Sequence, residues 1–384
     1  MKFLYTAGTA RGGTNFRTLM LNGHSNIQMS IDPFIPLFRF YRDSILKHLG
    51  KHELLNRVPN KDILDDYYFD STKLEIMQAV QGFDEDIEFD LSLWGELKQQ
   101  IAARMSLASM NLIKHLDMLP ASTFKEVFCN LVNLVTAESE GDIVWAGFND
   151  NWTSEFFPLV ARLIPDAKFI VHLRDPRSVV HSSEYAEPDP AKHPPIITFA
   201  RHLRKHFAFA TMFQTAPELE NRLLITYYES FLDDPDKELL EITDFLGIEF
   251  ESHMSDIDRF RKADGSQWPS NKSDYKNSKD IWRHENYKNL TELTEFICDP
   301  EMRLYGYYPE IYTNEKGLSD GAFNFLIDNV KTSLGWNTDF DEIERVVGSE
   351  FYRKRILQSP REMSSEEINR LFLFSEVYEK VLNI

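Results

Sequence analysis

Residues 168–183 read KFIVHLRDPRSVVHSS, and the first six of them give the clearest strand signal in the chain. The segment KFIVHL is almost entirely apolar, which is typical of a strand buried on both faces of a parallel sheet. Pro176 then opens a helical pattern, because proline is favoured in the first turn of a helix. A strand that runs directly into a helix predicts an α/β fold.

The same alternation of strands and helices extends on both sides of this stretch. Apolar segments typical of buried strands are KFLYTA (2–7), DIVWA (142–146) and RLLITYY (222–228). Helical patterns start at Phe16 and also cover residues 152–163, 196–216 and 234–248. We therefore predict a P-loop-like, three-layer αβα fold with a central parallel sheet.

Two segments lie outside this alternation. Residues 40–140 have mostly helical patterns and carry much of the acid, so we predict a helical insertion there. Residues 311–384 form a run of amphipathic helical segments without a motif that we can identify. The expected organisation is one domain over residues 1–310, with the insertion inside it, followed by a helical C-terminal extension.

The balance of charge is strongly acidic. The chain of 384 residues has 42 Lys and Arg against 61 Asp and Glu, which gives a formal net charge of −19. Nucleic acids are bound by basic patches, so this balance argues against a nucleic-acid partner and against a polyanionic substrate. An anionic ligand would have to be held by a few local cationic groups.

The sequence also bears on location. No run of 18 apolar residues occurs, so we expect no membrane span. Polar residues and glycines begin at Thr6, which does not fit a secretory signal peptide. We therefore expect a cytoplasmic protein.

A glycine-rich turn follows the first predicted strand. Gly8 and Gly13 have the spacing of a phosphate-binding loop, but Thr14 and Asn15 stand where a nucleotide triphosphatase has Lys and then Ser or Thr. The hydroxyl that would bind Mg²⁺ is thus missing, and Arg11 is the cation of this turn. The loop predicts a phosphate-bearing donor that is handled without a metal, and it argues against an ATP-dependent kinase. A plain tight turn with a solvated Arg11 is the alternative.

A second candidate phosphate site begins at the end of the best strand. Arg174 follows that strand directly, where open α/β sheets bind ligands. Ser182 comes eight residues later, about two helical turns on, so its hydroxyl can face the same region. The alternative is that Arg174 pairs with a carboxylate and Ser182 is an ordinary helix residue.

Three motifs in this order resemble the superfamily of PAPS-dependent sulfotransferases, in its bacterial form and with some likeness to tyrosylprotein sulfotransferases. The motifs are TARGGTN (9–15), FIVHLRDPRSVVHSS (169–183) and ITYYESFLDDPDKELLEITDFLGIEF (225–250). The resemblance implies transfer of a sulfuryl group from 3′-phosphoadenosine 5′-phosphosulfate (PAPS) to a hydroxyl or an amine. It implies no metal, and it leaves 3′-phosphoadenosine 5′-phosphate (PAP) as the spent donor.

The resemblance also implies a set of donor-binding residues. The turn would hold the 5′-phosphosulfate, with Arg11 stabilising the charge that develops on the bridging oxygen. The 3′-phosphate would bind Arg174 and Ser182, and Tyr228 would lie near the nucleotide. A later loop in WPSNKSDYK (268–276) would close over the donor. The implied donor contacts are Arg11, Gly12, Gly13, Thr14, Asn15, Arg174, Ser182, Tyr228, Lys272 and Ser273.

Proton transfer from the acceptor requires a base, and Asp32 is the candidate. It stands 21 residues after Arg11, where the tyrosylprotein sulfotransferases and related bacterial enzymes carry a Glu. The alternative is a turn residue before Pro33. Histidines are the other candidate bases, namely His24, His115, His172 and His181.

One departure from the resemblance concerns the acceptor side. Many relatives have a Lys shortly before the RDPR strand, whereas the corresponding stretch here, WAGFNDNW (145–152), has none. Asn149, Asn151 or Trp152 would take its place, which suggests a changed acceptor pocket. The leading prediction for the acceptor is a neutral or cationic small molecule of secondary metabolism, with a hydroxyl, amine or guanidinium group.

Other functions stay open from sequence alone. A tyrosine-bearing peptide is the alternative acceptor. A P-loop small-molecule kinase is a second class of protein, and a non-enzymatic binding protein with the same fold is a third. The sequence also leaves a homodimer open.

Overall fold

The computed structural model describes residues 1–9, 11–57, 67–181, 196–262, 265–267, 279–332 and 340–384. The chain divides into two compact units. Unit 1 comprises Met1–Pro59, Ile76–Leu173 and Phe213–Lys272, and unit 2 comprises Asn60–Glu75, Arg174–Met212 and Ser273–Ile384. These two units are defined by which segments contact one another. The predicted domain boundary at residue 310 was drawn from the extent of the motifs, and it stays a prediction.

Unit 1 is built on a five-stranded sheet with the order β2-β3-β1-β4-β5. All neighbouring strands pair in parallel, with Thr6 opposite Asn149 and Gly8 opposite His172. The strands are β1 (Lys2–Gly8), β2 (Ile27–Ile31), β3 (Trp145–Asn149), β4 (Lys168–Leu173) and β5 (Leu223–Tyr227). The predicted α/β fold with a central parallel sheet is therefore confirmed.

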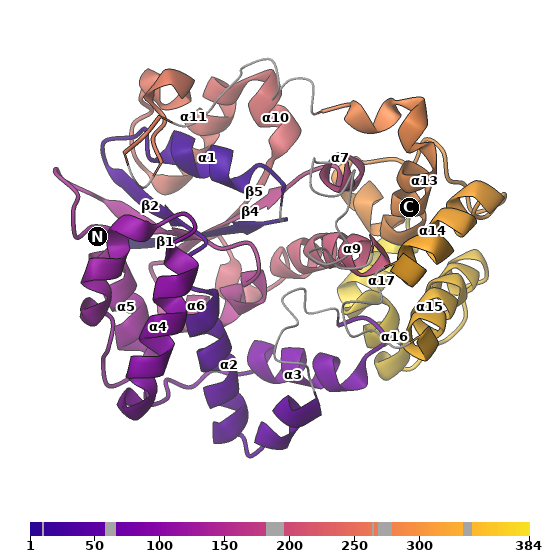
Figure 1. Cartoon of the computed structure of the whole chain (residues 1–384), viewed down its shortest axis with the longest axis horizontal. Helices are drawn as coiled ribbons and strands as arrows, with labels where there is room; N and C mark the ends of the chain where they lie inside the picture. Colours follow the sequence, from indigo (N-terminus) through magenta and orange to yellow (C-terminus); the bar gives the residue numbers. More distant parts are fainter. Residues whose placement is uncertain (10, 58–66, 182–195, 263–264, 268–278, 333–339) are drawn as a thin grey trace. The chain divides into compact units, whose positions relative to one another are not determined.

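Helices cover both faces of this sheet (Figure 1). On one face lie α1 (Thr14–Leu21), α10 (Tyr228–Asp233) and α11 (Pro235–Leu246), and on the other lie α2 (Ile35–His48), α5 (Phe124–Val135) and α6 (Phe157–Leu163). The insertion supplies two further helices, α3 (Ser71–Gln81) and α4 (Trp94–Met105). The strands of a parallel sheet are apolar on both faces, and the helices that connect them cover these faces.

An aromatic core joins the sheet to the helices of the second face. Tyr5 of β1 lies with its ring centre 4.6 Å from those of Phe148 and Phe157, and it stacks on Phe38 of α2 at 5.4 Å. The buried Tyr5 hydroxyl donates to the carbonyl oxygen of Thr153 at 2.6 Å. This core fixes the ends of β1 and β3, from which the candidate site is built.

The predicted strands agree with the observed strands to different degrees. The strand predicted over residues 168–173 coincides with β4, and the one at 222–228 contains β5. The strand predicted at 142–146 is observed three residues further along, as β3. The strand β2 was not predicted, because Gln28 and Ser30 interrupt its five residues.

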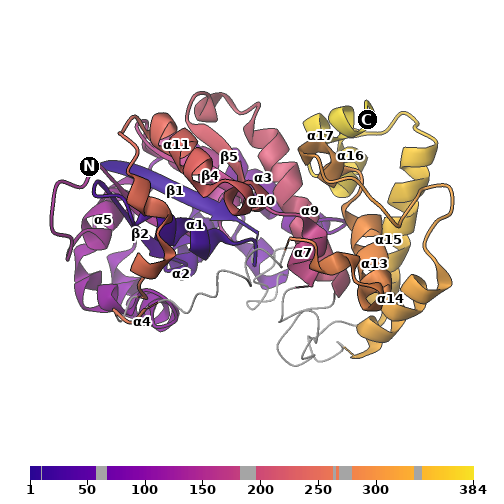
Figure 2. The same ribbon diagram turned by 90° about the horizontal axis from the view of Figure 1, so that it is seen from above.

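Unit 2 is helical in its described part. Its helices are α7 (Pro176–Val180), most of α9 (Ile196–Phe213), α13 (Lys288–Cys298), α14 (Asp320–Thr332), α15 (Phe340–Gln358), α16 (Ser365–Phe372) and α17 (Ser375–Val381). Helices α13, α14 and α15 lie side by side in Figure 1 and Figure 2. Phe351 of α15 contacts Phe296 of α13 and Phe323 of α14.

A buried ion network ties the C-terminal segment to α9. The carboxylate of Glu350 accepts from both terminal nitrogens of Arg204, at 2.7 and 3.0 Å, and lies 3.4 Å from Nε of Arg201. All three side chains are buried, so the loss of one partner would leave an uncompensated charge in the interior. Within the described ranges, no helix combines the length and apolar character that a membrane span requires.

Candidate active site

The carboxyl ends of the five strands meet at one edge of the sheet, and the strand order reverses at β1. From β1 the chain passes to β2, beyond β3, and from β3 it crosses to β4 on the other side of β1. Open α/β sheets bind ligands outside the carboxyl ends of their strands at such a switch point. The glycine-rich turn follows β1 at this point.

The turn is tight, and its shape depends on glycine. The N–H of Gly12 donates to the carbonyl of Thr9 at 2.9 Å, and Arg11 has a positive φ of 60°. Gly13 has a φ of 84°, and a Cβ atom there would collide with the ring of Tyr228. The structure thus brings Tyr228 directly against the turn, while its place near a nucleotide stays a prediction.

Helix α1 begins directly after this glycine. Gly13 is the N-cap and supplies no side-chain acceptor, and the first turn contains no acidic residue. The hydroxyl of Thr9 is buried without a hydrogen-bond partner among the described residues. Uncapped N–H groups at a helix N-terminus attract phosphate and sulfate groups, so the turn fits an anionic donor. The predicted residues Arg11, Gly12, Gly13, Thr14 and Asn15 come together here.

Asp32 follows β2 at the same edge of the sheet. Its N–H donates to the carbonyl of Asn149 at 2.7 Å, and its Oδ1 accepts from the N–H of Asn151 at 3.2 Å. Arg104 of α4 donates from Nε to the Asp32 carbonyl at 3.0 Å, and its Nη2 lies 3.9 Å from Oδ2. Asp32 has a φ of 46°, a conformation that Asp and Asn adopt more readily than most residues. Its side chain is held on several sides yet remains 20% exposed.

A second carboxyl group, Asp150, lies beside Asp32 and was missed in the sequence. It is fully buried, its Oδ1 accepts from the N–H of Trp152, and its Oδ2 has no hydrogen-bond partner among the described residues. Burial raises the pKa of Asp150, and the negative charge of Asp32 raises it further. Burial also raises the pKa of Asp32, but Arg104 and the N–H of Asn151 oppose this. Asp32 is the carboxyl group of this pair that is partly exposed and lies beside the Arg104 guanidinium.

Asn149 ends β3, in the stretch where the resemblance led us to expect a changed acceptor pocket. Its Oδ1 accepts from Nη2 of Arg17 at 3.0 Å and from the hydroxyl of Thr6 at 3.2 Å. Arg17 lies on α1 and is fully buried, and this burial lowers its pKa to about 9. Arg17 was not predicted, since an arginine in a helix ordinarily faces solvent. A buried guanidinium thus supports Asn149 from α1.

The candidate histidines are engaged in hydrogen bonds. His24 contacts the carbonyl of Glu249 at 2.7 Å, and His115 contacts Glu138. His172 lies within β4, and its Nδ1 is 2.8 Å from the hydroxyl of Thr226. In unit 2, Nε2 of His181 lies 3.1 Å from the hydroxyl of Thr291, and burial lowers the pKa of His181 to about 4. Asp32, which is ionisable and partly exposed, is the better candidate base.

The second predicted phosphate site begins with unit 2. Arg174 directly follows the last residue of β4 and is buried. Ser182, Lys272 and Ser273 lie outside the described residues, so their predicted roles stay predictions.

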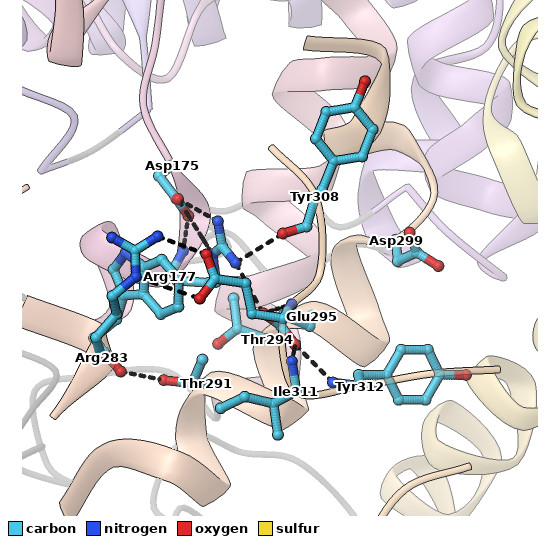
Figure 3. A network of polar contacts seen from close by, with 12 residues as sticks. Asp175, Arg177, Arg283, Thr291, Thr294, Glu295, Asp299, Tyr308, Ile311 and Tyr312 are labelled. Carbon is cyan, nitrogen blue, oxygen red and sulfur yellow. Dashed lines mark hydrogen bonds and ion pairs between the residues drawn. The ribbon is translucent and has the colours of Figure 1, made fainter. Parts of the chain in front are cut away.

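The rest of the RDPR motif forms a network within unit 2 (Figure 3). Asp175 caps α7 by accepting from the N–H of Arg177 at 2.9 Å, and it also binds the Arg177 guanidinium. Arg177 in turn donates to Glu295 of α13 at 2.9 Å and to the carbonyl of Tyr308 at 2.9 Å. The guanidinium lies 3.7 Å from the ring centre of Trp282. Asp175 and Arg177 thus serve to fix the short helix that follows Arg174.

The chain belongs to the sulfotransferase family, whose sequence profile matches residues 4–252. This confirms the predicted family and decides against the kinase alternative. Among the described residues, no group of three or more His, Cys, Asp or Glu side chains is arranged to hold a metal ion.

Comparisons with individual proteins show similarity over a shorter stretch of sequence or at lower identity. A putative protein-tyrosine sulfotransferase of Caenorhabditis elegans is 30% identical over 105 residues, which is 27% of this chain and 40% of that protein. One from Caenorhabditis briggsae is 26% identical over the same length, with 38% of that protein covered. The chain thus matches less than half of these curated relatives. A solved sulfotransferase domain from the curacin biosynthetic pathway has a TM-score of 0.42 at 13% identity, covering 86% of this chain and 97% of that domain.

Proposed function

We propose that the protein transfers a sulfuryl group from PAPS to a hydroxyl, amine or guanidinium group of a small-molecule acceptor. The observation that carries this proposal is the glycine turn that leads into the N-terminus of α1, whose N-cap Gly13 has no side chain, at the same sheet edge as Asp32. The turn has Arg11 but neither the lysine nor the Mg²⁺-binding hydroxyl of a triphosphatase. Such a turn suits an anionic donor that needs no metal.

In this proposal the donor is bound at its two charged ends. The turn and α1 hold the 5′-phosphosulfate, and Tyr228 lies beside it. Arg174 and Ser182 bind the 3′-phosphate by charge-assisted hydrogen bonds. The proposed donor-binding residues are Arg11, Gly12, Gly13, Thr14, Asn15, Arg174, Ser182, Tyr228, Lys272 and Ser273.

The transfer itself is an in-line displacement at sulfur. The acceptor oxygen or nitrogen forms a bond to sulfur while the bond from sulfur to the bridging phosphate oxygen breaks. Asp32 takes the proton of the acceptor group as general base. The negative charge passes to the phosphate of the spent donor, PAP. Arg11 and the N–H groups of α1 stabilise that charge.

The acceptor is proposed to be neutral or cationic. Two carboxyl groups, Asp32 and Asp150, lie together where Asp32 contacts the guanidinium of Arg104. The chain as a whole is acidic, which disfavours an anionic acceptor. A small molecule of secondary metabolism fits this chemistry. A tyrosine-bearing peptide is the second candidate, supported by the likeness of 105 residues to the putative protein-tyrosine sulfotransferases. A cytoplasmic location and a homodimer remain predictions.

Donor binding tests the proposed function directly. PAP should raise the thermal unfolding midpoint, whereas ATP with Mg²⁺ should leave it unchanged. A ligand at a hundredfold excess over its Kd stabilises the folded state by about 2.7 kcal/mol, so the shift is readily measured by differential scanning fluorimetry. A shift with ATP and Mg²⁺ and none with PAP would contradict the proposal.

The role of Arg104 leads to a prediction about pH. Its charge favours the ionised form of Asp32 and so lowers the Asp32 pKa. In Arg104→Gln this effect is lost, the Asp32 pKa rises further, and the base is protonated at higher pH. We expect the acid limb of the kcat/KM profile to move to higher pH, by up to about one unit.

The matched variant for this measurement is Arg104→Lys, which retains the positive charge and should keep the limb near its original pH. Profiles would be recorded for both variants at saturating donor. An acid limb that stays in place in Arg104→Gln would show that Asp32 is not the titrating base.

A further inference from the structure

The short helix α7 is held by a buried carboxylate of α13, that of Glu295 (Figure 3). Glu295 has no exposed surface, and its Oε1 accepts from Nη1 of Arg177 at 2.9 Å. Arg177 is the fourth residue of the RDPR motif and is itself bound by Asp175 at the start of α7. The chain Glu295–Arg177–Asp175 thus connects α13 to the beginning of α7.

The same carboxylate also organises a later segment of the chain. Its Oε1 accepts from the N–H of Glu310 at 2.8 Å, and its Oε2 accepts from the N–H groups of Ile311 and Tyr312 at 2.9 and 2.8 Å. Glu295 therefore accepts four N–H groups with its two oxygens. A buried carboxylate that is satisfied in this way has one fixed orientation, and it fixes Arg177 in turn.

Two further contacts continue along α7. The hydroxyl of Ser178 donates to the carbonyl of Lys279 at 2.7 Å. Thr291 of α13 donates its hydroxyl to the carbonyl of Trp282, so it accepts from Nε2 of His181 at 3.1 Å. Helix α7 is thus anchored within unit 2 from its N-cap, Asp175, to its C-cap, His181.

We propose that Glu295 is a positioning residue for the 3′-phosphate of the donor, and that it acts through Arg177. This inference rests on the proposed function, in which Arg174 binds that phosphate. Arg174 stands two residues before α7 and is bonded to Asp175, the N-cap of that helix. A helix of five residues has little stability of its own, so its geometry depends on the contacts that Glu295 organises.

The test compares two nucleotides that differ in the 3′-phosphate. Isothermal titration calorimetry would give the affinities of PAP and of adenosine 5′-phosphate (AMP) for the full chain and for Glu295→Gln. We expect the preference for PAP over AMP to fall by about tenfold or more in Glu295→Gln. Without the carboxylate that holds Arg177, α7 would shift, and the 3′-phosphate would lose one charge-assisted contact. The affinity for AMP should stay the same.

Glu292→Gln is the matched control. Glu292 is also a buried carboxylate of α13, but it binds the N–H and hydroxyl of Ser319. The PAP preference should be unchanged in this variant. If Glu295→Gln does not fold, Arg177→Lys replaces it as the test, since lysine keeps the charge but loses the planar fork that binds Asp175 and Glu295 together.

The outcomes separate the inference from the function on which it rests. A wild-type chain that binds PAP no better than AMP would overturn the proposed function and this inference with it. A strong wild-type preference that Glu295→Gln and Arg177→Lys leave intact, even with a lower unfolding midpoint, would overturn this inference alone. Glu295 would then be a residue of folding stability only.

Discussion

Replacing Asp32 with Asn should lower kcat by about two to four orders of magnitude, the range ordinarily lost with a general base. Asparagine has nearly the same shape and accepts the positive φ of 46° at this position, so the turn after β2 is retained. The contact with the N–H of Asn151 can persist through the amide oxygen. The substitution removes the negative charge of Asp32 and with it the ability to take a proton. The measurement is single-turnover transfer at saturating donor, together with the Kd of PAP.

The Kd of PAP should be unchanged in this variant, because Asp32 is proposed to act on the acceptor. Asp117→Asn serves as the control, since Asp117 is an exposed carboxylate that pairs with Lys98 on the surface of the insertion. Near-normal turnover of Asp32→Asn with intact PAP binding would remove Asp32 as the base. Asp32 would then be a turn residue before Pro33, and Asp150 would become the carboxyl group to test.

Replacing Arg11 with Asn should reduce kcat by about a hundredfold to a thousandfold, as does the loss of one preorganised donor to a developing negative charge. Arg11 has a positive φ of 60°, and asparagine tolerates this conformation, so the glycine turn keeps its shape. The variant therefore removes the guanidinium without changing the N–H groups at the start of α1. Donor affinity should also fall, since the 5′-phosphosulfate loses a cation.

Arg57→Asn is the control for this variant, because Arg57 is an exposed arginine of unit 1 outside the site. Its turnover should equal that of the wild type. If Arg11→Asn bound PAP more weakly but kept its kcat, Arg11 would contribute to donor binding and not to the transfer step. Unchanged kcat and unchanged donor affinity together would place Arg11 outside the site.

Much of the fold could be read from short stretches of sequence. The apolar run at 168–173 coincides with β4, and Pro235 and Gly247 bound α11 as N-terminal proline and C-terminal glycine do in other helices. These signals are local, because burial on both faces of a strand and the ends of a helix depend on consecutive residues. The order of the three motifs was enough to identify the family.

Errors arose where tertiary contacts override local pattern. The strand β2 contains two polar residues, Gln28 and Ser30, and it is an edge strand, so its five residues lack a continuous apolar signal. The strand β3 was predicted three residues too early, which left Asn149 and Asp150 in an apparent loop. Without the end of β3, the position of Asp150 beside Asp32 could not be predicted.

The sequence by itself determined the α/β class, the glycine turn without a triphosphatase lysine, and the family. Each of these can be inferred from short segments of contiguous residues. The tertiary structure decided which distant groups share a site. Asp32 and Asp150 are 118 residues apart in the chain, and so are Arg177 and Glu295. Their proximity depends on strand order in unit 1 and on helix packing in unit 2, which no local periodicity encodes. Burial also turned Asp150 and Arg17 from ordinary polar residues into groups with shifted pKa values, because desolvation penalises the charged form.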